Sequence, residues 1–242
     1  MNNLILDDQL YIELESMRVK LYGQSFHDPE TDARIEIPGL NSIDYKELFE
    51  YNNSVSDIYF RFKDSHDEIF LSLKLLELFD SIELKKNNIR KSQYLTYHIK
   101  YWYIKLATTF ELAVNLIGII YDLRISEKFI NFKIIENNKY VKSNSNVYAC
   151  FKKLDTLVAS DIRNKIIHHQ KFDNDLLFEL SLSDLFNIPM SFGDEVENNI
   201  NVDILIKEYY TKTDVFTQNL NLLIQSLTPV FKEICGNKEF GQ

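Results

Sequence analysis

The stretch SQYLTYHIKYWYIKLATTFELAVNLIGIIYDL, residues 92–123, decides the fold. It contains no proline and a single glycine near its end, so nothing in it interrupts a helix. Apolar and aromatic residues occur around the whole circumference of the helix that it would form, which is typical of a widely buried helix. We therefore expect this stretch to be the central helix, about 45 Å long for about 30 residues, of an all-α protein.

The composition also favours long helices in a soluble protein. Only 4 prolines and 6 glycines occur among 242 residues, too few breakers for many short elements. The two cysteines, Cys150 and Cys235, have neither metal-ligand spacing nor disulfide density, which indicates a reducing compartment. The N-terminal residues lack the pattern of a signal peptide, and the longest apolar window, 113–120, is too short to span a membrane. We expect a cytoplasmic protein with no membrane association.

Apolar periodicity predicts helices over residues 1–22, 44–62, 65–85, 92–123, 126–136, 145–169 and 201–235. Ser65 and Glu68 form a capping box that would begin the third of these. The fragment RIEI, 34–37, lies in a long connection, where it would be a strand with no evident partner. Residues 137–146 and 187–199 are predicted to be polar loops. Pro229 is expected to kink the last helix or end it early.

These elements predict a helical bundle with long central helices and an N-terminal helical extension. The bundle would span residues 91–236 and be built from the helices at 92–123, 145–169 and 201–235. Residues 1–90 would form a separate helical region, to which the sequence assigns no role.

The net charge of -9 restricts any role with nucleic acid. Non-specific binding to DNA or RNA depends on Lys and Arg neutralising phosphates, and this chain would repel a polyanion over most of its surface. If the protein handles RNA, it must do so through a local cationic patch.

Residues 160–170, SDIRNKIIHHQ, combine an arginine, an amide and two histidines at the end of a predicted helix. At about 100° per residue, Asn164 and His168 share one flank, whereas Arg163 lies about 140° away from His168. Arg163 and His168 would therefore converge only if the helix ends at the histidine or if two copies face each other across a two-fold axis. The buried face of this helix would consist of Val147, Phe151, Leu154, Val158, Ile162 and Ile166.

The same residues are also compatible with an ordinary solvated helix end, because short motifs of this kind often arise by chance. His169 is predicted to point inward as a structural histidine. His27, His66 and His98 have no spacing partners that resemble a metal site, so we expect neither a metal nor a cofactor.

The sequence IRNKIIHH, 162–169, resembles the Arg-x4-His signature of the HEPN superfamily. The resemblance covers about residues 90–236 and implies a helical bundle that is often a homodimer. It also implies metal-independent ribonuclease activity in toxin–antitoxin, abortive-infection or CRISPR-linked phage defence. By this resemblance Arg163, Asn164 and His168 are the catalytic residues, and a polar residue after the arginine is the variant found in active members. A subset of the family continues the signature as His-x-Tyr, and this chain has Gln170 in place of that tyrosine.

The residue types suit cleavage of RNA, which carries its own 2′-OH nucleophile. A histidine titrates near neutrality and can transfer the proton, while an arginine can hold the phosphate and stabilise the transition state. We therefore expect an endoribonuclease that acts on RNA as a homodimer, with an antitoxin or defence-system protein as a partner. The alternative is a non-catalytic HEPN-fold module that binds a nucleotide or a partner protein.

Overall fold

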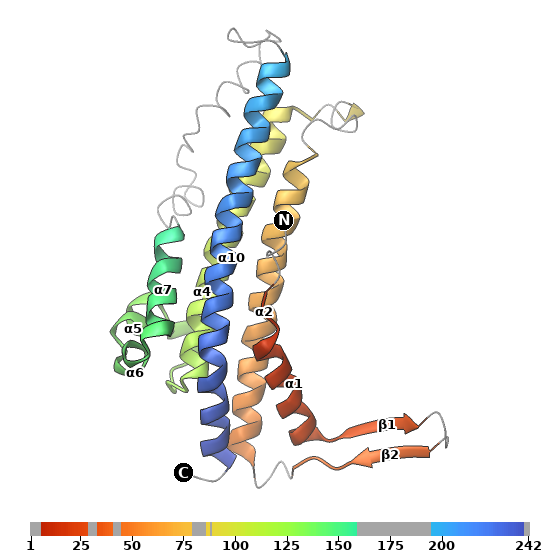
Figure 1. The fold of residues 1–242 in the computed structure, drawn as a ribbon, viewed down its shortest axis with the longest axis vertical. Helices are drawn as coiled ribbons and strands as arrows, with labels where there is room; N and C mark the ends of the chain where they lie inside the picture. The colour runs from red at the N-terminus through yellow and green to blue at the C-terminus, as the bar shows by residue number, and fades with distance from the viewer. Residues whose placement is uncertain are drawn as a thin grey trace. The chain divides into compact units, whose positions relative to one another are not determined.

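The computed structural model of the chain describes residues 6–28, 33–40, 45–78, 86–87, 89–158 and 195–239. Of residues 24–28, 33–37 and 195–201 it describes the backbone alone. The described chain is all-α apart from one β-hairpin (Figure 1). Its α-helices are α1 (Gln9–Tyr22), α2 (Lys46–Leu76), α4 (Lys91–Ile120), α5 (Phe132–Asn137), α6 (Lys139–Ser143), α7 (Ser145–Leu157) and α10 (Glu195–Glu239). A 3-10 helix, η1 (Glu127–Phe129), precedes α5.

The chain divides into two units, and α2, α4, α7 and α10 each contribute residues to both. Unit 1 contains the described residues of Lys63–Phe110 and Leu154–Gln218. Unit 2 contains those of Ile5–Phe62, Glu111–Lys153 and Asn219–Gln242.

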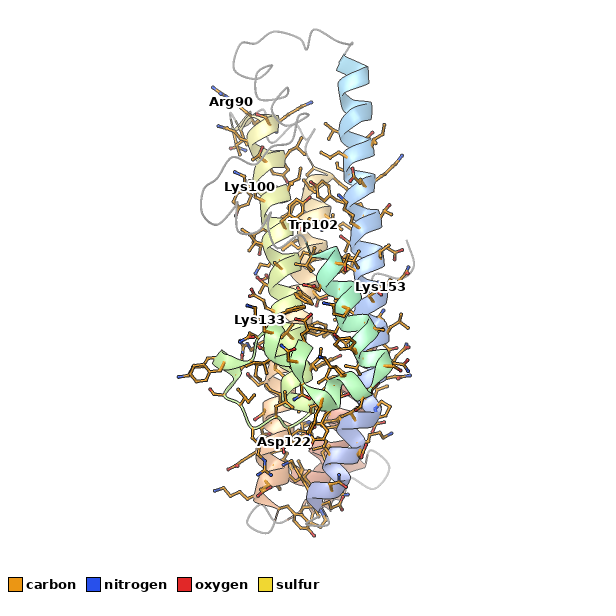
Figure 2. The ribbon with its side chains drawn as sticks, turned by 90° about the vertical axis from the view of Figure 1, so that its left-hand side faces the viewer. Arg90, Lys100, Trp102, Asp122, Lys133 and Lys153 are labelled. Atoms are coloured by element: carbon orange, nitrogen blue, oxygen red, sulfur yellow. The ribbon has the colours of Figure 1, made fainter. Side chains whose placement is uncertain are left out.

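The core of unit 1 lies among α2, α4 and α10. Trp102 is buried and points from α4 toward α10 (Figure 2), where its Nε1 donates a hydrogen bond to Thr213 Oγ1 at 2.9 Å. The Trp102 ring also meets the Tyr209 ring edge to face, with centroids 4.8 Å apart. Such an aromatic pair combines a large buried area with a satisfied indole N–H.

The core of unit 2 joins α1 to the first part of α2 and the last part of α10. Leu10, Leu14 and Leu21 of α1 are buried. Tyr51 of α2 stacks on Phe231 of α10, with centroids 5.8 Å apart, and its hydroxyl donates to the Ile120 carbonyl at 2.8 Å.

The prediction for the central helix is confirmed, because α4 runs from Lys91 to Ile120. α4 is also the one described helix that is long and apolar enough to cross a membrane by length and composition alone. More than half of the residues in its most apolar window are buried, and the core helix of a soluble protein passes the same test, so this is weak evidence for a span.

The two helices predicted over 44–62 and 65–85 are one continuous helix, α2, as far as the structure describes them. Ser65 lies in the middle of this helix, where its buried hydroxyl is 2.9 Å from Thr109 Oγ1 of α4. The prediction of a capping box at Ser65 was therefore wrong. No proline or glycine separates the two predicted helices, so the backbone continues without a break.

The predicted unpaired strand does have a partner. β1 (Gln24–Asp28) and β2 (Ala33–Ile37) form an antiparallel pair in which Phe26 is opposite Ile35. The segment QSFHD has low β-propensity, so its composition gave little sign that it would pair with RIEI.

Two further predictions need correction. Residues 139–143, expected to be a loop, form α6, whose first turn is capped by the Asn138 side chain through hydrogen bonds from Tyr140 N and Val141 N. The last helix does not end early at Pro229, which was one of the two outcomes expected there, but continues to Glu239. Its first residues, 195–199, extend into the segment expected to be a loop. Leu227 and Phe231 are buried on either side of Pro229, so packing holds the helix where the proline removes one hydrogen bond.

Candidate functional site

The predicted catalytic residues, Arg163, Asn164 and His168, lie within 159–194 and therefore outside the described residues. His169 and Gln170 lie there too. What the structure describes is the helix that leads toward them, α7, and the surroundings of the histidines in unit 1.

The buried face of α7 agrees with the predicted helical phase. Val147, Phe151, Leu154 and Val158 are all buried, and they recur at intervals of three or four residues. The remaining predicted members of this face, Ile162 and Ile166, lie outside the described residues. The apolar face is thus confirmed to within five residues of Arg163.

Contacts in unit 2 fix the beginning of α7. The Asn144 side chain accepts a hydrogen bond from Val147 N at 3.2 Å and caps the first turn. Phe151 stacks on Phe132 of α5 with centroids 4.8 Å apart, and Lys152 pairs with Glu136 at 2.9 Å. These contacts anchor the helix whose sequence continues into the candidate motif.

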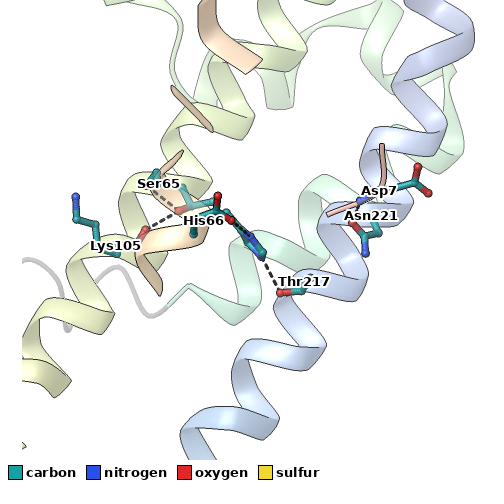
Figure 3. A network of polar contacts seen from close by, with 8 residues as sticks. Asp7, Ser65, His66, Lys105, Thr217 and Asn221 are labelled. Carbon is teal, nitrogen blue, oxygen red and sulfur yellow. Dashed lines mark hydrogen bonds and ion pairs between the residues drawn. The ribbon is translucent and has the colours of Figure 1, made fainter. Parts of the chain in front are cut away.

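His66 belongs to the core of unit 1. Its side chain is fully buried on α2, with Nε2 2.9 Å from Thr217 Oγ1 of α10 (Figure 3). His66 Nδ1 has no hydrogen-bond partner, and desolvation lowers the pKa of this histidine to about 4. The ring is therefore neutral at pH 7.

His98 of α4 is also buried in unit 1. It lies edge to face against the rings of Tyr94 and Tyr97, at centroid distances of 4.4 and 5.1 Å. Desolvation lowers its pKa as well. Among the described residues no group of three or more His, Cys, Asp or Glu side chains is arranged to hold a metal ion.

A pocket of about 700 Å³ opens in unit 2. Residues of α2, the end of α4, the segment after it and Lys238 of α10 line this pocket. Asp122 and Arg124 in that segment have φ of 47° and 53°, in the left-handed region that few non-glycine residues adopt. The carboxylates of the pocket are Glu47, Glu50, Asp57, Asp122 and Glu127.

Most charges in this pocket are already compensated. Lys238, whose side chain is only 12% exposed, pairs with Asp122 at 2.8 Å and with Glu47 at 3.7 Å. Arg61 pairs with Glu127 at 2.8 Å and with Asp57 at 3.4 Å. No histidine is among the lining residues. The pocket therefore lacks an imidazole that would transfer a proton near neutral pH.

The long α-helices and the Arg-x4-His sequence define a HEPN-type helical domain. Residues 43–235 match the family described as HEPN_Cthe2314-like HEPN. Because this match spans well over half of the 242 residues, the chain belongs to this HEPN family. Comparison with curated proteins and with solved structures finds no match.

The family match begins at residue 43, inside the region that the sequence assigned to an N-terminal extension. The two structural units also combine segments from both sides of residue 90. The predicted domain boundary at residues 90 and 91 stays a prediction.

Proposed function

We propose that this HEPN protein is a metal-independent endoribonuclease whose reacting groups are Arg163, Asn164 and His168. His168 would accept or donate the proton as the 2′-OH attacks the adjacent phosphate. Arg163 would hold that phosphate and stabilise the negative charge that develops in the transition state. Asn164 would orient the phosphate or the imidazole. The products would be a 2′,3′-cyclic phosphate and a 5′-OH.

The observation that carries this proposal is the burial of His66 and His98, the two histidines whose side chains the structure describes. A proton-transfer group must reach its substrate, and both of these rings are enclosed in the core with lowered pKa values. The role would then fall to a histidine elsewhere in the chain. His168 is the one that follows an arginine and an amide in the spacing of the HEPN signature.

The phase of α7 also supports the proposal. Its buried face follows the predicted pattern to the end of the helix at Leu157 and on to Val158, which agrees with the phase from which the positions of Arg163 and His168 were predicted. Membership of a HEPN family supports the fold and the reaction class together.

Purified protein incubated with a mixed-sequence RNA in EDTA tests the activity. We expect cleavage to continue in the chelator and single-stranded DNA of the same sequence to stay intact, because DNA lacks the 2′-OH. His168→Ala should abolish cleavage, whereas Gln170→Ala, two residues away, should retain it and serves as the matched control.

Three results would contradict this mechanism. They are activity that disappears with EDTA and returns with a divalent ion, full activity of His168→Ala, and cleavage of the DNA. Absence of RNA cleavage by wild-type protein under all conditions would favour the alternative, a non-catalytic HEPN module that binds a nucleotide or a partner protein.

A homodimer is part of the proposal, because Arg163 and His168 would point about 140° apart on one regular helix. Two copies related by a two-fold axis would bring both sets of residues around one groove. Mixing inactive Arg163→Ala and inactive His168→Ala subunits tests this arrangement. Recovery of part of the wild-type activity indicates that one subunit supplies arginine and the other histidine. A stable monomer in sedimentation that still cleaves RNA would rule the dimer out.

We further propose that the enzyme is a toxin or a phage-defence effector held in check by a partner protein. Expression in bacterial cells should then arrest growth, and His168→Ala should relieve the arrest. Equal toxicity of the two proteins would separate the growth effect from RNA cleavage and contradict this role.

A further inference from the structure

The positive charge of unit 1 is concentrated on one segment. Residues 85–110 contain six lysines and arginines and not one aspartate or glutamate, in a chain whose net charge is -9. The other described segments of unit 1 are acidic on balance: residues 63–78 carry two lysines and four carboxylates, and residues 202–218 carry two lysines and three carboxylates. Residues 86–110 therefore carry most of the positive charge among the described residues of this unit.

The exposed side of α4 in unit 1 is a stripe of cations and tyrosines. At 100° per residue, Tyr97, Lys100 and Tyr101 fall within an arc of about 100°, and Arg90 immediately precedes the helix. Figure 2 shows Lys100 on α4 and Arg90 next to the first turn of α4, both away from Trp102, which points toward α10. The buried residues of the same helix, including Leu95, Ile99 and Leu106, fall on the opposite side.

Two tyrosine rings are arranged in parallel at the centre of this stripe. The Tyr97 and Tyr101 rings are 6.4 Å apart between centroids with an interplanar angle of 5°, and Tyr97 is 64% exposed. Lys105 pairs with Glu68, and its Nζ also lies 5.3 Å from the centre of the Tyr101 ring. Tyr101 is half-buried. Parallel aromatic rings flanked by cations are the features that hold the bases and phosphates of a single strand.

Arg90 and Lys100 are available for such phosphates. No ion pair or hydrogen bond joins either side chain to a residue that the structure describes. Arg90 is exposed and immediately precedes α4, and Lys100 is half exposed in the third turn of that helix.

We propose that the stripe formed by Arg90, Tyr97, Lys100 and Tyr101 is a binding surface for single-stranded RNA. Phosphates would contact Arg90 and Lys100, and bases would stack on the faces of Tyr97 and Tyr101. The rings suit unpaired bases, because the bases of a duplex are already stacked on one another. This inference rests on the proposed function, since it supplies the local cationic patch that a chain of net charge -9 needs to hold an RNA substrate.

RNA suits this stripe better than the other occupants of an exposed helix face. An acidic protein segment would pair with the cations but would leave two parallel rings without a role. A second copy of the chain would bring together two identical cationic surfaces that repel each other. Both remain outcomes of the experiment below.

Fluorescence anisotropy with a labelled single-stranded 2′-O-methyl RNA of twelve nucleotides tests the surface. The modified RNA lacks a free 2′-OH, so wild-type protein can bind it without cleaving it. We expect Tyr97→Leu to weaken binding about tenfold, as the loss of one stacked base predicts, and Tyr97→Phe to bind like wild type because the ring remains.

The charge of the stripe is tested with a matched pair of double variants. Arg90→Gln with Lys100→Gln should weaken binding and reduce the slope of log Kd against log salt by about 1.4, for two lost phosphate contacts on a single strand. Lys46→Gln with Lys212→Gln changes the net charge equally, but those lysines pair with Glu50 and Glu208 on α2 and α10. This control should bind within twofold of wild type.

Several outcomes would overturn the inference. They are unchanged binding by Tyr97→Leu, equal weakening by the two double variants, and a change in sedimentation of Tyr97→Leu that marks the stripe as an interface between copies. Binding of an acidic peptide in place of the RNA would overturn it as well.

The two proposals can fail separately. If wild-type protein binds the modified RNA through this stripe but cleaves no unmodified RNA, the surface stands and the ribonuclease proposal fails. If the protein cleaves RNA while Tyr97→Leu has wild-type affinity for the modified RNA, the ribonuclease proposal stands and the surface fails.

Discussion

Protonation of His66 should destabilise unit 1 as the pH falls. In the folded protein, burial lowers the pKa of His66 to about 4, whereas in the unfolded chain a histidine has a pKa of about 6.5. Between these two values the unfolded chain binds a proton that the folded chain does not. The free energy of unfolding is therefore highest above pH 6.5 and is lost progressively as the pH falls toward 4.

The size of this effect follows from the two pKa values. A difference of about 2.5 pH units predicts a loss of about 2 kcal/mol between pH 7 and pH 5, and of about 3 kcal/mol by pH 4. The lowered pKa of His98 adds to the loss with the same sign. Asp67, whose Oδ1 lies 3.9 Å from His66 Nδ1, acts in the opposite direction, because desolvation raises its pKa.

Urea unfolding at pH 7, 6 and 5 measures the effect through the fluorescence of Trp102. This is the only tryptophan in the chain, and it is buried in the same unit as His66. His66→Gln is the comparison, because a glutamine side chain does not titrate. Wild type should lose about 2 kcal/mol more than His66→Gln between pH 7 and pH 5. Any damage that the substitution causes at every pH cancels in this difference.

Parallel pH dependence of the two proteins would refute the reasoning. So would an NMR titration in which the His66 ring protonates near pH 6.5 in the folded protein. In either case the ring would be solvated, and the contact between His66 and Thr217 would not persist in solution.

Two further predictions concern unit 2. Gly236→Ala should raise the free energy of unfolding by about 1 kcal/mol, because glycine is a poor helix former and an added Cβ at this position of α10 would meet no atom within 4 Å. Gly118→Ala should raise the free energy of unfolding by less, or lower it, because its Cβ would lie 2.8 Å from Ile130 Cγ2. Urea unfolding measures both variants. An equal increase in the two would contradict the packing at Gly118. Phe151→Ala should cost about 3–5 kcal/mol by removing a fully buried ring that stacks on Phe132. Urea unfolding followed by circular dichroism measures this cost. A decrease in the free energy of unfolding below about 1 kcal/mol would show that the Phe151 ring is exposed to solvent.

The sequence predicted α4 and the buried face of α7 because both depend on local properties. Residues 91–120 contain one glycine and no proline, so a helix could be read directly from the absence of breakers. The spacing of Val147, Phe151 and Leu154 likewise identifies the side of α7 that packs against the protein. Helical periodicity carries this information residue by residue.

Errors arose where tertiary contacts override a local signal. Ser65 has the sequence context of an N-cap, but its hydroxyl lies against Thr109 in the core and the helix continues. Pro229 is a helix breaker by propensity, yet buried Leu227 and Phe231 hold α10 together across it. A capping motif or a proline changes the free energy of a helix by about 1–3 kcal/mol. Burial of several side chains contributes more than this and decides where the helix continues.

For the candidate site, too, the sequence reveals the residue types but not their arrangement in space. The residue types of Arg163, Asn164 and His168 could be recognised from sequence, but whether they converge depends on where a helix ends or on a second copy of the chain, which spacing does not encode. The stripe around Tyr97 was missed for a different reason. The net charge of -9 describes the whole chain and conceals the segment 85–110, which contains no carboxylate.

The apolar composition of α4 affects how the unfolded protein behaves. In the native protein this helix is mostly buried, but it alone among the described helices is apolar enough to enter a lipid bilayer. A heated chain would expose about 30 largely apolar residues, and exposed apolar surface of this kind promotes association with other chains or with lipid. Thermal denaturation should therefore be irreversible and dependent on the heating rate. During synthesis, α4 would therefore have to be kept from membranes and from other unfolded chains until α2 and α10 pack against it.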